Sequence, residues 1–309
     1  MNWKMKALLQ GTFSLLPFGE PLNHFFQRHV TRSLPTSAAK CGGIVSVAKQ
    51  HFDLLQRHGT RPLEDATFYE FGAGWDLMIP FALYCFGVDH QILVDIRQLV
   101  RVYLVNDAIA KLQRLAGSLR LPRVPQRYLG NDQTEALATL RDEYGIDYRA
   151  PVNARDTQMP EVSIDYITST NTLEHIPAHD ICAVLGECNR VLRDDGLMSV
   201  QIDYQDHYAY FDTRISVYNF LKYSDRAWSW LNPGLHYQNR LRHRDYLELF
   251  DVTGFEIVED LRAEGAASDL AVLAELPLAT RFHRYSPAEL GIRHSLVLLR
   301  KRRDNGARR

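Results

Sequence analysis

The chain has 309 residues, of which 46% are hydrophobic and 24% are charged, and its formal net charge is −1. This length and composition are those of an ordinary globular protein with a large buried core, and they exclude a chain dominated by disorder. The near-zero net charge excludes an overall field that would attract nucleic acid or an anionic membrane.

The two ends of the chain and its cysteines indicate a cytoplasmic protein. Near the N-terminus, Gly11, Pro17 and Gly19 break a short apolar run before it could span a membrane, and no signal-type cleavage site follows. The C-terminal residues 302–309 form a basic tail that we expect to be solvated. The four cysteines show neither zinc-site spacing nor the density of a disulfide framework, which is typical of a reducing compartment. The sequence therefore predicts a cytoplasmic location, with no stable insertion into a membrane.

Strand-like and helix-like segments alternate along the chain. Apolar residues at helical spacing predict helices over residues 37–58, 75–87, 97–117, 134–145, 178–196 and 242–254. Short apolar or β-branched runs predict strands over residues 67–74, 91–96, 151–156, 161–171, 197–204, 254–263 and 292–301. This alternation indicates an α/β protein with a Rossmann-like, doubly wound and mainly parallel seven-stranded sheet, whose ligand lies at the carboxyl edge of the strands.

The first predicted strand ends in a glycine turn, EFGAG (residues 70–74). Glycine is needed where the backbone turns sharply and approaches a ligand without a Cβ in the way. The third glycine of a dinucleotide motif is missing and no Gly-Lys-Ser/Thr follows, so the turn favours neither NAD nor a phosphate loop. Asp95 closes the next strand, where a carboxylate can accept both hydroxyls of a ribose, and Asp156 follows the predicted third strand. Glu70 could bind a ligand's ammonium group or fix the turn, and each of these acids could instead cap a helix.

Five segments in order, EFGAG, ILVDI, ARDTQMP, IDYITSTNTLEHIP and ECNRVLRDDG, resemble the class I S-adenosylmethionine-dependent methyltransferases. The resemblance covers about residues 65–205, and its LEHI and RVL motifs are similar to those of the small-molecule branch. Trp75 stands where the family has a third glycine, and Asp195 stands in place of the first of two glycines; both places vary in the family. The resemblance implies a methyltransferase with S-adenosylmethionine as its cofactor.

The resemblance also implies, by motif position, which residues hold the cofactor. The residues expected around its methionine part and its ribose are Glu70, Gly72, Gly74 and Asp95. The residues expected near its adenine and beside its sulfonium are Asp156, Thr157 and Asn171. His175, which follows in the same motif as Asn171, has either a structural or a catalytic role.

An aromatic segment follows the predicted fifth strand: ten of the 34 residues from Tyr204 to Tyr237 are Phe, Tyr or Trp. Rings mixed with amides and charges are typical of sites for sugars and aromatic metabolites, although these rings could equally pack on the core of a helical insertion. The residues expected to bind the methyl acceptor are Tyr204, Tyr208, Tyr218, Asn219 and Arg240. His207 lies just beyond the strand end that should face the methyl group, and we expect it to be the general base, with His175 as the other catalytic candidate.

Oxygen-rich side chains around this segment leave a metal-assisted reaction as an alternative. Asp203, Asp206, His207 and Asp212 could together hold a magnesium ion. Their spacing matches no metal motif, so the sequence predicts no metal.

The predicted elements divide the chain into five parts. These are an N-terminal helical arm or lid (1–60), a cofactor-binding core (61–204), an aromatic insertion that covers the substrate (205–245), the C-terminal part of the sheet (246–301) and the basic tail (302–309). The function expected of this arrangement is S-adenosylmethionine-dependent methylation, mainly at oxygen, of a small molecule or a sugar-containing metabolite.

Three other functions are weighed against this one. A non-catalytic or regulatory protein that keeps the fold as a cofactor-binding module is the alternative of a different class. An NAD-dependent oxidoreductase is disfavoured by the glycine spacing. A nucleic-acid partner is not expected, because residues 171–174 read NTLE in place of the D/N-P-P-Y turn of base methylation.

Overall fold

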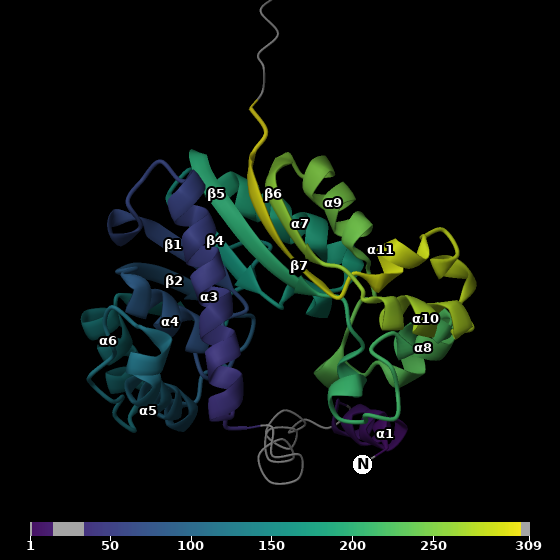
Figure 1. Cartoon of the computed structure of the whole chain (residues 1–309). Helices are drawn as coiled ribbons and strands as arrows, with labels where there is room; N and C mark the ends of the chain where they lie inside the picture. Colours follow the sequence, from purple (N-terminus) through teal and green to yellow (C-terminus); the bar gives the residue numbers. More distant parts are fainter. Residues whose placement is uncertain (1, 15–33, 304–309) are drawn as a thin grey trace, which may run out of the picture.

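The computed structural model describes residues 2–14 and 34–303. Expectations that fall on residues 15–33 of the N-terminal arm and on residues 304–309 of the basic tail lie outside the described residues. In the described part, seven strands form one sheet in the order β3-β2-β1-β4-β5-β7-β6, which confirms the predicted Rossmann-like fold (Figure 1). The strands are β1 (Thr67–Phe71), β2 (His90–Val94), β3 (Ile146–Arg149), β4 (Ile164–Thr170), β5 (Leu192–Asp203), β6 (Phe255–Ala263) and β7 (His294–Lys301).

The first five strands run parallel, and the last two join the sheet antiparallel. β1 pairs in parallel with β2 and β4, β2 with β3, and β4 with β5. β7 pairs antiparallel with both β5 and β6. The strand order reverses between β1 and β4, so the loops that follow these two strands diverge and leave a crevice at the carboxyl edge, which is where such sheets bind ligands.

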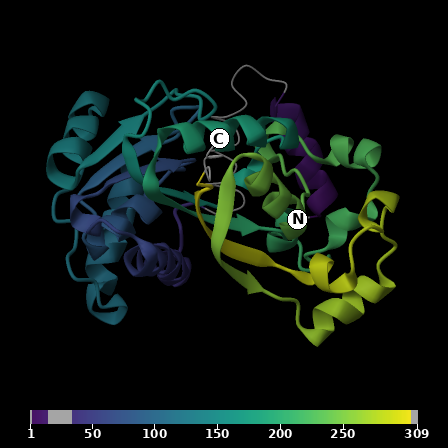
Figure 2. The same ribbon diagram turned by 90° about the horizontal axis from the view of Figure 1, so that it is seen from above.

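Helices cover both faces of the sheet (Figures 1 and 2). One hydrophobic cluster joins α3, α4, α5 and α6 to one face, and a second joins α7 and α9 to the other. Successive residues of β1, Phe68 and Tyr69, belong to different clusters, as the alternation of side chains along a strand requires. Among the described residues, no helix is both long and apolar enough to cross a lipid bilayer.

The remaining elements are helical. The α-helices are α1 (Trp3–Ser14), α3 (Ala38–His58), α4 (Met78–Phe86), α5 (Val102–Leu119), α6 (Gln133–Tyr144), α7 (Ala178–Val191), α8 (Asp225–Leu231), α9 (His243–Val252), α10 (Ala267–Glu275) and α11 (Pro287–Gly291). The short 3-10 helices are η1 (Leu63–Asp65), η2 (Leu173–His175), η3 (His207–Tyr210), η4 (Asn219–Lys222), η5 (Gly234–His236) and η6 (Thr280–Phe282).

The third strand lies earlier in the chain than predicted. It is β3, which pairs with β2, and residues 151–156 instead form a loop with one isolated bridge between Asn153 and Asp156. Ile146 and Tyr148 are buried, as the inward face of a strand requires. The strand escaped prediction because it has only four residues, two of them charged, and follows directly on the helix stop at Gly145.

Three predicted helix boundaries also differ from the structure. α4 begins at Met78 and α5 at Val102, so the residues just before each helix are loops at the carboxyl edge of the sheet. α7 ends at Val191 and β5 begins at the next residue, so Gly196 lies inside a strand and does not stop a helix.

The structural units of the chain do not follow the boundaries predicted at residues 60, 204 and 245 for the N-terminal arm and the insertion. α3 packs against α4, α5 and β5, so it is a layer of the core and not part of an arm. α1 instead packs against η5 and α8 of the insertion. A second insertion, residues 264–293 between β6 and β7, shares a hydrophobic cluster with both. We call α1, residues 205–242 and residues 264–293 the helical lobe (Figure 1).

Candidate functional site

Two pockets lie side by side at the carboxyl edge of β1, β2 and β4. The first has a volume of about 390 Å³ and the second a volume of about 560 Å³. Gly72, Gly74 and Asn171 line both pockets. A ligand that lies across these three residues would place one end in each pocket.

The glycine turn after β1 forms the floor between the two pockets. Gly72 and Gly74 have φ angles of +79° and +76°, in the left-handed region that glycine adopts without strain. The N–H of Gly72 donates to the carbonyl oxygen of Val94 (3.0 Å), which ties the turn to the end of β2. A Cβ on Gly72 would overlap the side chain of Thr172, whereas a Cβ on Gly74 would meet nothing within 4 Å. Gly72 is therefore required by the close approach of the loop after β4, and Gly74 leaves the backbone open to a ligand.

Glu70 lies beneath the turn and lines the second pocket. Its side chain is 3% exposed, and the hydroxyl of Thr168 donates to its Oε2 (3.1 Å). Burial raises the pKa of Glu70 to about 8, against the opposing effect of the Thr168 hydrogen bond. The carboxyl group therefore holds a proton at neutral pH, and an ammonium group in the second pocket would favour its ionised form.

Asp95, directly after β2, lines the first pocket. Its side chain is buried, and the N–H of Arg97 donates to its Oδ1 (3.3 Å). Burial raises the pKa of Asp95, and the backbone N–H groups of Arg97 and Gly74 partly offset this. The structure places this carboxylate at the wall of a pocket, where it can accept the two hydroxyls of a ribose.

Asn171, directly after β4, stands between the two pockets. Its φ angle is +50°, and its N–H donates to the carbonyl oxygen of Gln201 on β5 (3.0 Å). This bend brings the residue opposite the glycine turn. Asn171 thus lies beside the middle of any ligand that spans both pockets, which is the place predicted for the sulfonium.

The structure does not bring Asp156 and Thr157 into the first pocket. Thr157 donates from its N–H and its hydroxyl to Glu187, and Asp156 accepts from Gln158. The residues of this loop that line the first pocket are Asn153, Ala154 and Arg155. The loop residues at the pocket thus lie a few positions before the pair expected near the adenine, because β3 ends at Arg149 and the chain enters the crevice earlier than expected.

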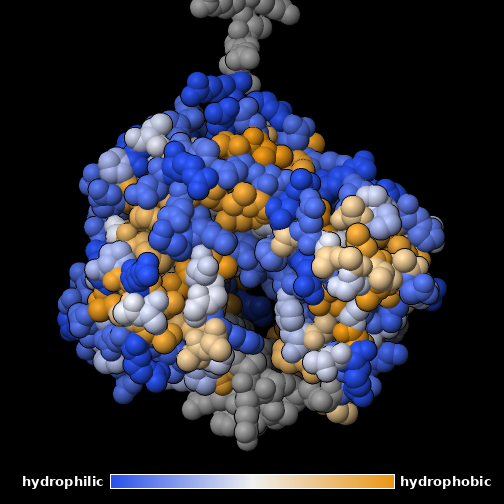
Figure 3. Space-filling view, viewed as in Figure 1, coloured by the Kyte–Doolittle hydropathy of each residue, from blue (hydrophilic) through white to orange (hydrophobic). Residues whose placement is uncertain are grey.

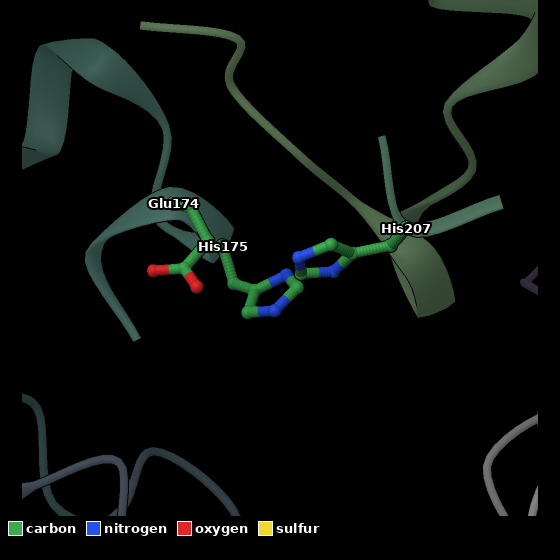
Figure 4. A group of neighbouring side chains, drawn as sticks. All are labelled: Glu174, His175 and His207. Carbon is green, nitrogen blue, oxygen red and sulfur yellow. The ribbon is translucent and has the colours of Figure 1, made fainter. Parts of the chain in front are cut away.

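Two histidines from different loops meet at the rim of the first pocket (Figure 4). The ring centroids of His175 on η2 and His207 on η3 are 5.0 Å apart. His175 lines the first pocket, and its Nδ1 lies 2.7 Å from the carbonyl oxygen of Tyr237. The Nε2 of His207 lies 3.2 Å from Oδ2 of Asp203 at the end of β5. The structure therefore places both predicted catalytic residues in one group, with His175 at the pocket and His207 behind it.

The surroundings of His175 make it a weak base. Its ring is exposed at the first pocket, and the protein groups on its other side reduce its contact with water. Desolvation, together with the neighbouring His207, lowers the pKa of His175 to about 4. The imidazole of His175 is therefore neutral at physiological pH.

The cluster that could hold a metal ion differs from the one considered from the sequence. In the described part of the chain, the metal-ligand type side chains that come together are Glu174, His175 and His207, whose ligand atoms lie within 4.8 Å of one another. Asp206 instead accepts hydrogen bonds from Asn219 and the N–H of Tyr208, and Asp212 accepts from Arg214 and Trp3. The acids of the insertion thus have structural partners.

The five residues expected to bind the acceptor are packing residues of the helical lobe and its base. All five are at least 98% buried, and none lines the first or second pocket. The hydroxyl of Tyr204 shares a hydrogen bond with the hydroxyl of Ser295. The hydroxyls of Tyr208 and Tyr218 donate to the carbonyl oxygens of Leu231 and Gly291, respectively. Asn219 donates to Asp206, and the guanidinium of Arg240 donates to the carbonyl oxygens of Phe220 and Tyr223 and to Asp225. This expectation is therefore corrected: the five side chains are packed inside the protein and bond to other protein groups, while Oδ1 of Asn219 and Nε of Arg240 are buried without a hydrogen-bond partner among the described residues.

Other residues line the pockets without having been predicted. Lys40, Gly43, Ile44 and Val47 of α3 line the second pocket. They repeat at helical spacing, so the helix was predictable, but nothing local to residues 38–58 indicates that this face meets the glycine turn. Only the packing of α3 against α4 places it there.

A hollow separates the core from the helical lobe. In the space-filling view it lies between the side of the molecule that carries α3 and the side that carries the lobe (Figure 3). An acceptor in this hollow would lie between the cofactor edge of the sheet and the insertion.

The residues at the two pockets fit S-adenosylmethionine. Glu70, buried with no cationic partner in the described part of the chain, suits an ammonium group, and Asp95 suits a ribose. The positive φ angles of Gly72 and Gly74 let the backbone approach the middle of such a ligand. The first pocket is lined mostly by apolar groups, as a purine ring requires.

Comparisons with known proteins find methyltransferases among the chains that are similar to this one. A sphingolipid C9-methyltransferase of Candida albicans is 36% identical over 83 residues, which are 24% of this chain and 16% of that protein, so the chain spans a small part of that relative. Among solved structures, 1,6-didemethyltoxoflavin-N1-methyltransferase of Burkholderia thailandensis is similar, with 13% identity, a TM-score of 0.45 and coverage of 91% of this chain and 86% of that one. Geranyl diphosphate C-methyltransferase of Streptomyces coelicolor A3(2) is similar with 13% identity, a TM-score of 0.44 and coverage of 82% and 77%.

A family match covers most of the chain. Residues 47–260 match the family described as "Methyltransferase domain". This range holds the glycine turn, Asp95, Asn171 and both histidines. The chain therefore belongs to the S-adenosylmethionine-dependent methyltransferases.

Proposed function

We propose that this protein transfers the methyl group of S-adenosylmethionine to a hydroxyl oxygen of a small molecule or sugar-containing metabolite, with His207 as the general base. The observation that carries the proposal is the contact of His207 with His175, the histidine that lines the first pocket. A hydroxyl acceptor must lose a proton during transfer, and an imidazole is the side chain suited to take it near neutral pH.

The two histidines have different parts in this proposal. The low pKa of His175, about 4, makes it a poor proton acceptor, so it forms an uncharged wall beside the cofactor edge. His207 has its Nε2 3.2 Å from Oδ2 of Asp203 at the end of β5, on the side of the insertion.

The chain's own residues orient the reactants. The bound sulfonium supplies the methyl group as an electrophile. Glu70 and Asp95 would hold the two ends of the cofactor, and the glycine turn with Asn171 would fix its middle. Transfer is an in-line displacement, so its rate depends on this alignment and on the exclusion of water by the helical lobe.

Methylation at carbon is the second candidate. It is favoured by the 36% identity over 83 residues to a sphingolipid C9-methyltransferase. A carbon acceptor also releases a proton, so the same base would serve. Isotope-labelled methyl transfer followed by NMR of the product separates a methyl ether from a new carbon–carbon bond.

The experiment that tests the proposed function has two arms. Calorimetry with S-adenosylhomocysteine should show binding, and an acceptor panel of alcohols, phenols and glycosides should show transfer of labelled methyl. His207→Ala should lower turnover about a hundredfold without weakening cofactor binding; His179→Ala, an exposed histidine on α7, is the control. Cofactor binding with no transfer to any acceptor, and no effect of His207→Ala, would favour the alternative of a non-catalytic cofactor-binding protein.

The setting proposed for this activity is the cytoplasm. The four cysteines are free, and three of them are buried, which suits a reducing compartment. We propose no nucleic-acid partner. A tagged fusion located by fractionation would check the compartment.

A further inference from the structure

Three side chains with metal-ligand chemistry come together beside the first pocket. Glu174 and His175 are successive residues of η2, in the loop after β4, and His207 begins η3, after β5. One carboxyl oxygen of Glu174 and one ring nitrogen of each histidine lie within 4.8 Å of one another (Figure 4). Two imidazoles and one carboxylate are a donor set that proteins use for zinc and for other divalent transition metals.

The carboxyl group of Glu174 lacks a partner inside the described protein. The residue is 2% exposed, and neither of its carboxyl oxygens has a hydrogen-bond partner among the described residues. Burying a carboxyl group without hydrogen bonds or a counter-ion is strongly unfavourable. A group of this kind therefore points to a ligand that completes it.

One ring nitrogen of His207 is also without a partner. Its Nε2 is buried with no hydrogen bond to any described residue, although Oδ2 of Asp203 lies 3.2 Å away. That oxygen accepts from the hydroxyl of Tyr210, and Oδ1 of Asp203 accepts from the N–H and the side-chain amide of Gln205 (3.0 and 3.1 Å). Because the carboxyl group of Asp203 is engaged by these donors, Nε2 of His207 remains available to an ion.

His175 is held in the way that metal-ligating histidines are held. Its Nδ1 lies 2.7 Å from the carbonyl oxygen of Tyr237. A carbonyl oxygen can only accept, so Nδ1 carries the hydrogen and Nε2 has the lone pair that an ion needs. Such a bond from one ring nitrogen to a carbonyl or a carboxylate usually orients a histidine whose other nitrogen binds a metal.

Two successive residues of the insertion fix both loops that carry the cluster. The N–H of Asn239 donates to the carbonyl oxygen of Glu174 (2.9 Å), and its side-chain amide donates to two more carbonyl oxygens of the same loop (2.8 and 2.9 Å). The side chain of Gln238 accepts from the N–H of His207 (3.3 Å). The three ligand groups are thus brought together by contacts of the backbone around them, before any ion binds.

We infer that Glu174, His175 and His207 form a binding site for one zinc ion or a similar divalent transition metal ion, with three protein ligands and an open fourth position. The donor set disfavours magnesium, which prefers six oxygen ligands. Tetrahedral zinc has bonds of about 2.1 Å, which place its ligand atoms about 3.4 Å apart. The three groups therefore close by side-chain rotation on the order of an ångström when the ion binds.

The site stands on the geometry of the cluster, and only its effect on turnover rests on the proposed function. An ion at this site engages the lone pair with which His207 would take the acceptor's proton. Zinc should therefore inhibit methyl transfer, and removal of zinc by a chelator should restore it.

Calorimetry with ZnCl₂ on the metal-stripped full chain tests the site without any acceptor. We expect one equivalent to bind and the thermal unfolding transition to move upward in its presence. Glu174→Gln keeps the shape of the side chain, and His207→Gln removes one imidazole; each should weaken zinc binding about a hundredfold. A cooperative unfolding transition of each variant without zinc shows that it is folded. A millimolar excess of MgCl₂ should not displace the zinc, and displacement would overturn the assigned class of metal.

The control removes exposed side chains that can bind zinc elsewhere on the surface. His179 and Cys182 are both exposed and lie three residues apart on α7, so they share one face of the helix. The double variant His179→Gln/Cys182→Ser should bind zinc as the parent does. Loss of binding in this variant, with full binding by Glu174→Gln, would show an adventitious ion only and overturn the inference.

Turnover distinguishes a failure of this inference from a failure of the proposed function. No zinc binding by the parent, with turnover that still depends on His207, would refute the metal site and leave the proposed function intact. Zinc binding that depends on Glu174 and His207 but does not lower turnover would support the site and refute His207 as the general base.

Discussion

The Nδ1 atom of His175 lies 2.7 Å from the carbonyl oxygen of Tyr237, a residue 62 positions later in the chain. This contact joins the loop after β4, which lines the first pocket, to the end of the aromatic insertion. A second contact, from the N–H of Asn239 to the carbonyl oxygen of Glu174 (2.9 Å), lies beside it. The insertion is thus anchored directly on the residues that border the cofactor edge, so a shift of one moves the other.

Asp95→Ala should weaken S-adenosylhomocysteine binding about ten- to hundredfold, because the variant loses the charged acceptor expected for the ribose hydroxyls. Calorimetry measures the affinity, and thermal unfolding checks that the fold is intact. Asp142→Ala, an exposed acid on α6, is the control and should bind as the parent does. Equal affinity of Asp95→Ala and the parent would refute the ribose assignment.

Glu70→Gln should remove a pH dependence of stability. In the folded protein the pKa of Glu70 is about 8, against a usual value of 4.5. Between these values the folded state holds a proton that the unfolded state has lost, so the free energy of unfolding falls as the pH rises from 4.5 toward 8. Denaturant titrations at pH 5 and pH 8 on the parent and on Glu70→Gln measure the difference.

Cofactor binding should also release a proton from Glu70. If the cofactor's ammonium group lies against this carboxyl group, binding at pH 7 ionises it. The apparent binding enthalpy of the parent should then differ between phosphate and Tris, because the two buffers take up the released proton with different enthalpies. For Glu70→Gln, the difference between the two buffers should shrink to what other titrating groups contribute. No buffer dependence in the parent would place the ammonium group elsewhere.

Gly72→Ala should destabilise the protein by about 1–3 kcal/mol and abolish cofactor binding. Alanine is strained at a φ of +79°, and its Cβ would overlap Thr172. Gly186→Ala, in the middle of α7 with nothing within 4 Å of the new Cβ, is the matched control and should stabilise by about 0.5–1 kcal/mol. Thermal unfolding and calorimetry together check both variants.

Arg240→Ala should lower stability and leave the affinity for the cofactor unchanged in the folded fraction. The substitution removes the donors to the carbonyl oxygens of Phe220 and Tyr223 and leaves them buried, which costs about 2 kcal/mol or more. Arg226→Ala, an exposed arginine on α8, should have no such effect. An unchanged stability with a raised KM would restore the acceptor-binding role expected from the sequence.

The cofactor edge could be predicted because its signals are local. The glycine turn, the acid that closes β2 and the LEHI motif each lie within a few residues of a strand end, and the order of the strands brings those ends together. Asp95 and Asn171 line the first pocket, at the edge where the sequence predicts the cofactor; their contact with the cofactor stays a prediction. β3 was misplaced because four residues with two charges carry too weak a pattern, and the loop that lines the pocket was therefore expected a few residues too late.

The contacts of the aromatic insertion could not be predicted, because its side chains form hydrogen bonds with residues far away in the sequence. Tyr204 and Tyr218 have the composition of a binding surface, yet their hydroxyls bond to Ser295 and to the carbonyl oxygen of Gly291, in a part of the chain that was expected to be sheet alone. Ser295 lies on β7, and Gly291 belongs to the second insertion, between β6 and β7.

The sequence by itself determined the α/β fold, the family and the cofactor, since periodicity and short motifs act within one element and its adjoining loop. Only the tertiary structure decided that α3 lines the second pocket, that the aromatic insertion packs its rings inward, and that Asp203 and Glu174 meet beside His207. These relationships depend on close packing between elements tens of residues apart. Each element's own sequence sets which face is apolar, but not which neighbour will cover it.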